Sequence, residues 1–99
     1  MKGIFLLPDA QAELEGAADW YEARREGLGL RFVLEVDQAL QAIENTPAAF
    51  AEWDADPRFR KFVLRRFPFL VFYRETEERI EVVAVAHGAR EPGYWRKRK

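Results

Sequence analysis

The spacing of apolar residues changes once along this chain of 99 residues, and no other feature constrains its fold as strongly. In the first half the apolar side chains recur at helical spacings of three and four positions; they are Leu14, Ala17, Ala18 and Tyr21, followed by Phe32, Val36, Leu40 and Ile43. From Arg60 onward they form short runs rich in β-branched and aromatic side chains, which is typical of strands. The sequence therefore predicts helices first and strands afterwards.

Two helices are expected after a short N-terminal strand. Residues 2–7 predict the strand, which Pro8 ends because proline donates no hydrogen bond to a sheet. Asp9 is expected to cap the first helix, and the glycines of residues 27–29 are expected to end it. The connection to the second helix is so short that the two helices should form an antiparallel hairpin. We expect Leu40 to be buried in the second helix, so that Leu40→Ala would cost about 2–5 kcal/mol.

The second half predicts three strands that follow a short irregular segment. Residues 48–53, after Thr46-Pro47, predict one more helical turn, and residues 54–57 predict a loop. The strand-like runs are Phe62–Leu64, Phe69–Tyr73 and Ile80–Ala86, with connections short enough for hairpins. The side chains expected in the core are Phe32, Val36, Leu40, Leu64, Val71 and Val83.

The order β-α-α-β-β-β predicts an α+β fold in which a helical hairpin packs on one face of a mainly antiparallel sheet. A chain of this size has room for one hydrophobic core, so residues 1–99 are expected to form a single domain. The longest apolar run near the N-terminus, residues 4–7, is too short for a signal peptide or a membrane span. A cytoplasmic location without membrane association is the corresponding expectation.

Composition excludes several kinds of chemistry. The chain has no cysteine and no serine, so disulfides, thiolate metal sites and nucleophiles of either type are absent. It has no glycine-rich phosphate loop and a single histidine, and we expect neither a cofactor nor a metal ion. Asp54 and Asp56 have the ligand chemistry for a hard cation, but two aspartates before a proline are more typical of a turn.

Charge is distributed unevenly along the sequence. Residues 1–57 carry 4 basic and 12 acidic side chains, a balance of −8, whereas residues 58–99 carry 12 basic and 5 acidic side chains, a balance of +7. This asymmetry indicates either an anionic partner for the basic half or neutralisation between the two halves in the folded protein. The basic tail, residues 95–99, keeps the first alternative open.

The basic half supplies the candidate functional side chains. Arginine suits phosphate because its planar fork donates two parallel hydrogen bonds. Because neighbours on a strand point to opposite faces, only one of Arg65 and Arg66 is expected on a given side of the sheet. His87 ends the last predicted strand, where a histidine can exchange protons or can merely hydrogen-bond the backbone. Tyr94 and Trp95 can stack on nucleic-acid bases or fold the tail back onto the sheet, and packing is favoured for Trp95.

Taken together, these residues resemble the RelE/ParE superfamily of type II toxin–antitoxin toxins, in particular the ParE-like or plasmid-stabilisation toxins. The resemblance covers nearly the whole chain. The segments that carry it are Trp20-Tyr21-Glu22, Gly27-Leu28-Gly29 before Phe32, Ala39-Leu40, Ile43, Pro47, Phe50, Arg65-Arg66-Phe67-Pro68-Phe69, Val71, Tyr73, Val83-Ala84-Val85-Ala86-His87, and Arg90-Glu91-Pro92-Gly93-Tyr94-Trp95 followed by Arg98. The resemblance implies a growth-arresting toxin that a cognate antitoxin wraps and neutralises.

The resemblance leaves the target open between two classes. ParE-like members are implicated in poisoning DNA gyrase, whereas RelE-like members cleave mRNA on the ribosome without a metal ion. The Trp-Tyr-Glu, Gly-Leu-Gly and Arg-Phe-Pro segments favour gyrase, as does the presence of only one central lysine, Lys61. A third alternative is an inactive module that only binds its antitoxin.

Each alternative assigns different roles to the candidate residues. In a RelE-like nuclease Arg66 would bind the phosphate, and His87 and Tyr94 would transfer protons. The residues expected to bind the target or phosphate are Arg65, Arg90, Arg96 and Arg98. Arg60 and Lys61 are expected to meet carboxylates of the antitoxin.

Overall fold

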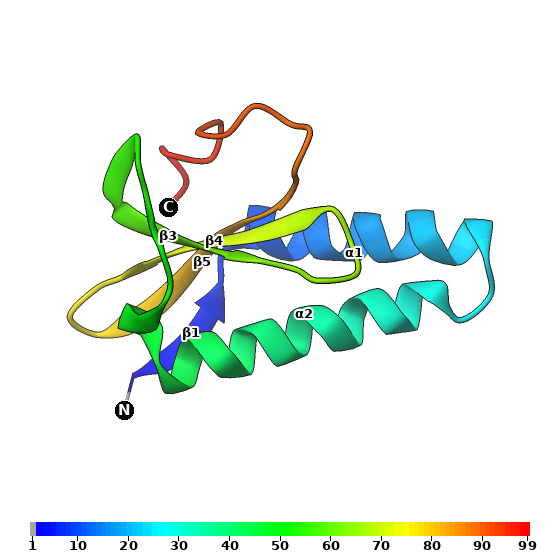
Figure 1. Cartoon of the computed structure of the whole chain (residues 1–99), viewed down its shortest axis with the longest axis horizontal. Coiled ribbons are helices and arrows are strands. Elements are labelled where there is room, and N and C mark those ends of the chain that lie inside the picture. The colour runs from blue at the N-terminus through cyan, green and yellow to red at the C-terminus, as the bar shows by residue number, and fades with distance from the viewer. Residues whose placement is uncertain (1) are drawn as a thin grey trace.

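The helical hairpin and the sheet form two layers in the computed structural model, which describes residues 2–99. The elements in chain order are β1 (Gly3–Leu6), α1 (Pro8–Arg24), α2 (Leu28–Asn45), the 3₁₀ turn η1 (Pro47–Ala49), β2 (Glu52–Trp53), β3 (Asp56–Val63), β4 (Phe69–Glu75) and β5 (Arg79–His87). Figure 1 shows the two helices lying alongside each other against the sheet. The predicted α+β class and the helical hairpin are confirmed.

The sheet has five strands in the order β1-β5-β4-β3-β2. β3, β4 and β5 form the predicted antiparallel hairpins, and β2 adds a short antiparallel edge strand. β1 pairs in parallel with β5, with Gly3 opposite Arg79, so the first and last strands of the chain are neighbours. Parallel neighbours need a long crossover, and the helical hairpin is part of the chain that connects them.

The segment before the first hairpin differs from the sequence prediction. The helical turn expected within residues 48–53 is confirmed only at Ala48 and Ala49, which belong to η1, whereas Glu52 and Trp53 pair with β3 as β2. The expected loop at residues 54–57 is a tight turn, since Asp56 and Pro57 already belong to β3. Pro57 stands near the start of this strand, where proline is tolerated.

The helix ends also differ in detail. Leu7 occupies the capping position of α1 and Pro8 the first helical position, so Asp9 does not cap the helix but lies in its first turn. Its carboxylate there still complements the positive end of the helix dipole. Gly27 does adopt the left-handed conformation, with φ of 86°, but it caps the start of α2 rather than the end of α1.

The turn of the helical hairpin gives structural roles to two segments that carry the family resemblance, residues 20–22 and residues 27–29. The Glu22 carboxylate of α1 accepts hydrogen bonds from the backbone N–H of Gly27 (2.9 Å) and of Gly29 (3.0 Å). This carboxylate satisfies amide groups at the start of α2 that have no partner within the helix. A Cβ atom on residue 29 would lie 2.5 Å from the Ala18 carbonyl oxygen, so the helices can approach this closely only with glycine there.

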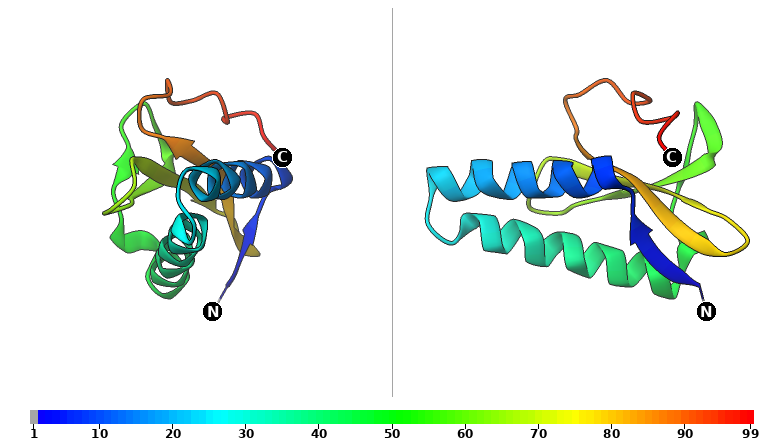
Figure 2. Two further views of the ribbon diagram at one scale, coloured as in Figure 1. Left: turned by 90° about the vertical axis from the view of Figure 1, so that its right-hand side faces the viewer. Right: turned by 180° about the vertical axis from the view of Figure 1, so that it is seen from behind.

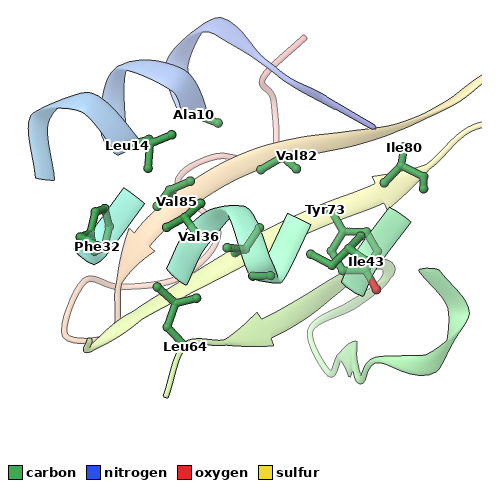
Figure 3. Close-up of a cluster of buried hydrophobic side chains, with 12 residues drawn as sticks. Ala10, Leu14, Phe32, Val36, Ile43, Leu64, Tyr73, Ile80, Val82 and Val85 are labelled. Atoms are coloured by element: carbon green, nitrogen blue, oxygen red, sulfur yellow. The ribbon is translucent and has the colours of Figure 1, made fainter. Parts of the chain in front are cut away.

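The face of the sheet that the helices cover holds the larger core. This helix-side core consists of Ala10, Leu14, Phe32, Val36, Ala39, Ile43, Leu64, Val71, Tyr73, Ile80, Val82 and Val85. Figure 3 shows side chains of α1 and α2 meeting those of the strands. Of the six side chains predicted to be buried, five are buried, but Leu40 is half-buried at the edge because Ala39 takes the inward position.

The opposite face of the sheet is covered by the C-terminal tail, residues 88–99. Figure 2 shows this segment passing over the side of the sheet that lies away from α2. The tail-side cluster consists of Leu7, Phe59, Phe72, Val83, Ala84, Ala86 and Trp95. Because both faces are covered, residues 80–86 of β5 are all buried, which accounts for the apolar run there. Neither helix in the described part of the chain combines the length and apolar character that crossing a bilayer requires.

Candidate functional site

A groove of about 560 Å³ lies where α1 passes the start of β4 and the end of β5. Its apolar wall is formed by Ala17, Trp20 and Tyr21 of α1 with Phe69 and Val85 of the sheet, and its polar lining includes Glu13, His87, Arg90 and Tyr94. The Trp20 side chain is 53% exposed, so a large aromatic surface remains open to solvent at this groove. Grooves of this size accept apolar groups while a few polar side chains fix their orientation.

Glu13 is the centre of the polar network in this groove. One carboxylate oxygen, Oε2, accepts the hydrogen bond of the Tyr94 hydroxyl at 2.6 Å. The other, Oε1, accepts bonds from the Arg98 guanidinium at 2.8 Å and from the Val85 N–H at 3.1 Å. Arg90 lies 3.5 Å from Oε2 and its guanidinium carbon lies 3.5 Å from the centre of the Tyr94 ring. A half-buried carboxylate therefore ties α1 to β5 and to the tail.

Tyr94 is held as a neutral hydrogen-bond donor. Burial, together with the hydrogen bond to Glu13 and the negative charge of that carboxylate, raises the pKa of Tyr94 to about 12. The phenol therefore keeps its proton at neutral pH and donates a hydrogen bond to Glu13. In this arrangement Tyr94 connects the tail to α1.

His87 ends β5, as the sequence predicts, and its side chain is exposed. Its Nδ1 accepts a hydrogen bond from the Ala89 backbone N–H at 3.0 Å, and its ring packs edge-on against Phe69 with 5.2 Å between ring centres. When the ring is neutral its proton therefore resides on Nε2. This geometry matches the alternative in which the histidine hydrogen-bonds the backbone.

Arg65 and Arg66 do not lie on a strand. They belong to the loop between β3 and β4, and the backbone N–H groups of both donate to the Glu35 carboxylate, at 2.7 and 3.0 Å. The expectation that they face opposite sides of the sheet is wrong, because the strand has already ended at Val63. Their exposed side chains line a hollow on the α2 side of the loop, whereas His87 and Tyr94 line the groove beside α1.

Three further candidate basic residues form polar contacts within the protein, and a fourth, Lys61, lines a cavity. Arg96 donates to the Ala55 carbonyl at 3.1 Å, and Arg98 pairs with Glu13. Arg60 donates to the Phe50 carbonyl at 2.6 Å, whereas Lys61 lines a smaller cavity of about 120 Å³ near Trp53.

The comparisons with known proteins identify the family. Residues 4–92 match the family model described as the ParE toxin of type II toxin–antitoxin systems, parDE. The chain belongs to the ParE toxin family. The resemblance predicted from the sequence is therefore confirmed, on its ParE-like side.

Individual relatives agree with this assignment to the ParE family. The chain is 32% identical over 78 residues to proteins named Toxin ParE2 from two strains of Mycobacterium tuberculosis, CDC 1551 and H37Rv, covering 79% of this chain and 72% of each relative. A solved structure described as the chromosomal ParDE TA system from P. aeruginosa has the same fold. It superposes with a TM-score of 0.75 at 20% identity and covers 88% of this chain and 96% of the other.

In this ParE-family chain most arginines of the basic half have carboxylate partners. Seven of the nine arginines after residue 57 form ion pairs; they are Arg58, Arg60, Arg74, Arg79, Arg90, Arg96 and Arg98. Several of the partners, including Asp9 and Glu13, come from the acidic half. Neutralisation between the halves therefore accounts for much of the charge asymmetry.

Asp56, the first residue of β3 after the turn at Asp54, is paired with arginines within the protein. Arg58 donates two side-chain hydrogen bonds to Asp56, at 2.9 and 2.6 Å, and these bonds lower the pKa of the carboxyl to about 2. Within residues 2–99, no three acidic or histidine side chains come together as a metal-holding cluster. Asp56 acts as the anchor of a turn.

Sequence reasoning missed Glu13, which organises the groove of this ParE-family toxin. Its position on α1 carries no local signal, because its partners Tyr94 and Arg98 lie 81 and 85 residues away along the chain. The excess of acidic residues in the first half is the only indication in the sequence that such pairs form.

Proposed function

We propose that this ParE-family chain is a growth-arresting toxin that binds and inhibits DNA gyrase in the cytoplasm, and that a cognate antitoxin neutralises it. Membership of the ParE family supports the toxin class. The observation that favours binding over RNA cleavage is the state of Tyr94, whose hydroxyl donates a hydrogen bond to Glu13 and whose pKa is raised to about 12. A general acid or base works best with a pKa near the operating pH.

The placement of Arg66 also favours a binding mechanism. A nuclease would need Arg66, His87 and Tyr94 around one phosphate, but Arg66 lines a separate hollow on the α2 side of its loop. The His87 ring remains exposed at the groove, and ribosome-dependent RNA cleavage is therefore retained as the second candidate function.

The antitoxin is proposed to occupy the groove beside α1 with an apolar helical segment. Trp20, Tyr21 and Phe69 line this groove with aromatic surface. An amphipathic helix that docks in a groove covers such a surface with its apolar face. Carboxylates of the antitoxin are expected to face the region of residues 60–66, where Arg60 and Lys61 lie. An open apolar groove favours association, so occupancy by a partner also keeps the toxin from aggregating.

The decisive experiment is to express the chain alone in bacteria and to follow growth, gyrase supercoiling and mRNA integrity. We expect growth arrest with inhibited supercoiling or trapped cleavage complexes, and mild effects of His87→Ala and Tyr94→Phe. Tyr21→Phe serves as a matched control for removal of a hydroxyl. A loss of about 10²–10⁴ in toxicity for His87→Ala, with cuts in translated mRNA and normal supercoiling, would instead establish the nuclease.

Two further outcomes define the remaining alternatives. If the chain binds its antitoxin but arrests nothing, it is an inactive antitoxin-binding module. If replacing Arg90 and Arg96 together abolishes gyrase inhibition while the circular dichroism spectrum is unchanged, the C-terminal tail of residues 88–99 contacts the target.

A further inference from the structure

A second surface lies on the other side of the loop that connects β3 and β4. Arg31, Leu34, Glu35 and Gln38 of α2 line an open hollow together with Arg65 and Arg66 of this loop. Phe67 follows in the same loop and packs against Phe32, with ring centres 5.1 Å apart, so it fixes the loop to the core. The hollow is therefore a defined surface, separate from the groove beside α1.

In the described part of the chain, the arginines of this hollow lack the internal ion pairs that most arginines of the basic half form. Arg65 and Arg66 are the two arginines after residue 57 that form no ion pair within residues 2–99, and Arg31 of α2 forms none either. The one carboxylate among them, Glu35, already accepts two backbone hydrogen bonds from the loop. Three unpaired guanidinium groups thus surround one carboxylate that is already hydrogen-bonded, and the hollow carries a net positive charge.

Exposed leucines adjoin these charges. Leu30 is 63% exposed and Leu34 is 52% exposed, although the same helix buries Phe32, Val36 and Ile43 in the core. The two residues are four positions apart, so they lie one above the other on the outer side of α2. A turn-spaced leucine pair next to arginines is complementary to a helix that carries its own apolar stripe beside acidic residues.

We propose that the outer side of α2 and the loop of Arg65 and Arg66 form a docking surface for an acidic amphipathic helix of a protein partner. The carboxylates of that helix pair with Arg31, Arg65 and Arg66, and its apolar stripe covers Leu30 and Leu34. A nucleic-acid backbone matches this surface less well, because phosphates and sugars leave the leucines uncovered. The surface exists whether or not the groove beside α1 is occupied, and the proposal does not depend on gyrase as the target.

The test uses the purified full chain and a synthetic fluorescein-labelled peptide helix of about five turns, with leucines on one side and glutamates beside them. Binding is followed by fluorescence anisotropy at low and at physiological ionic strength. A peptide with lysines in place of the glutamates and a single-stranded oligothymidine serve as the other probes. We expect the acidic peptide alone to bind, and more weakly as the salt concentration rises.

Matched pairs of variants separate charge from apolar contact. Arg65→Glu with Arg66→Glu is expected to weaken peptide binding about 10-fold or more, whereas Lys97→Glu with Lys99→Glu makes the same change of charge in the tail and should leave binding unchanged. Leu30→Gln with Leu34→Gln is expected to weaken binding severalfold. Phe5→Gln, which replaces another half-exposed apolar side chain on β1, should not.

The proposal is overturned if the acidic peptide does not bind, or if the lysine peptide or the oligothymidine binds as tightly. It is also overturned if the loop variant and the tail variant have equal effects. Circular dichroism of each variant shows that the fold is retained. Because no gyrase is present in this assay, its outcome is independent of the growth and supercoiling experiments.

Discussion

One face of the sheet is covered by helices of 17 and 18 residues, whereas the other is covered only by the tail of residues 88–99. The helix-side core spreads its contacts over side chains from most elements of the fold. The tail-side cluster is centred on one indole, Trp95, whose ring centre lies 4.5 Å from that of Phe72 and 4.7 Å from that of Phe59. The same sheet thus has one face with distributed packing and one that depends on a single anchor.

Polar contacts also hold the tail on its face of the sheet, but one buried polar group there lacks a partner among the described residues. Around Trp95 the tail is tied down by charged groups: Arg98 pairs with Glu13, Arg74 donates to the Arg98 carbonyl at 3.2 Å, and Arg96 lies 3.8 Å from Asp56. The Trp95 indole nitrogen itself is buried without a hydrogen-bond partner within residues 2–99. An unsatisfied buried donor lowers stability, so the tail side should be the weaker of the two.

The largest expected effect is on the helix-side core. Phe32→Ala removes a fully buried ring that packs against Phe67 and Phe69, and it should lower the free energy of unfolding by about 3–5 kcal/mol. Urea unfolding followed by circular dichroism measures this change. The matched control is Leu40→Ala, which should cost less than the roughly 2–5 kcal/mol of a buried leucine, because its side chain is half-buried. Equal losses of stability for Phe32→Ala and Leu40→Ala would mean that Phe32 is not more deeply packed in the helix-side core than Leu40.

A smaller effect is expected on the tail side. Trp95→Ala should cost about 2–3 kcal/mol, because the lost packing is partly offset by removal of the unsatisfied indole N–H. Hydrogen exchange should accelerate in residues 88–99 while the amides of α1 and α2 remain protected. Equal acceleration in both helices would show that the two faces unfold as one unit.

Glu13→Gln sharpens the comparison, because Glu13 joins the tail to α1. Loss of the charge-assisted bonds to Arg98 and Tyr94 should lower stability by about 1–3 kcal/mol. Glu15→Gln, at an exposed position of the same helix, should stay within about 0.5 kcal/mol of the parent chain. A cost for Glu13→Gln as small as that of the control would mean that the network in the groove does not hold the tail.

The smallest change in stability should come from lowering the pH. Hydrogen bonds from Arg74 and Arg79 lower the pKa of Glu81, and those from Arg58 lower the pKa of Asp56 to about 2. Both carboxyls have depressed pKa values in the folded state. Their contribution is therefore fully present above the ordinary carboxyl pKa of about 4, and for Asp56 it is lost as the pH falls from about 4 to 2.

Tryptophan fluorescence and hydrogen exchange between pH 5 and 2 follow this loss, and the tail should loosen before the helices. Asp56→Asn should flatten the dependence between about pH 4 and 2, because the variant has no carboxyl to protonate there. A steeper dependence in the helices than in the tail would reverse the proposed order.

Features with a local signal were predictable from the sequence. Phe32, Val36 and Ile43 follow the helical period, and the strand runs carry their own composition, so the helix-side core and the order of elements could be derived residue by residue. β2 could not, because a strand of two residues has no periodicity, and its pairing with β3 follows from the turn at Asp54 and Ala55. Leu40 was misplaced because Ala39, one position away, fits the same apolar side of the helix.

For the candidate site, the sequence identified candidate residues but not which residues they contact. His87 and Tyr94 were chosen for their chemistry, and both line the groove beside α1. That Tyr94 donates to Glu13, and that the loop of Arg65 and Arg66 is fixed by Glu35, depends on contacts between distant segments. Such contacts are set by the tertiary structure and leave no local pattern.

The pairing of β1 with β5 has a consequence for synthesis on the ribosome. A polypeptide emerges N-terminus first, but Gly3 lies opposite Arg79, and Glu13 meets Arg98 at a separation of 85 residues. The first helix can pack against α2 early, but β1 and the side of α1 that carries Glu13 lack their partners until residues 79–98 have been translated, because such non-local contacts form only when both segments are available. The groove lined by Glu13 and Tyr94 forms only after Tyr94 has been translated, so a protein that recognises this groove cannot bind a shorter nascent polypeptide.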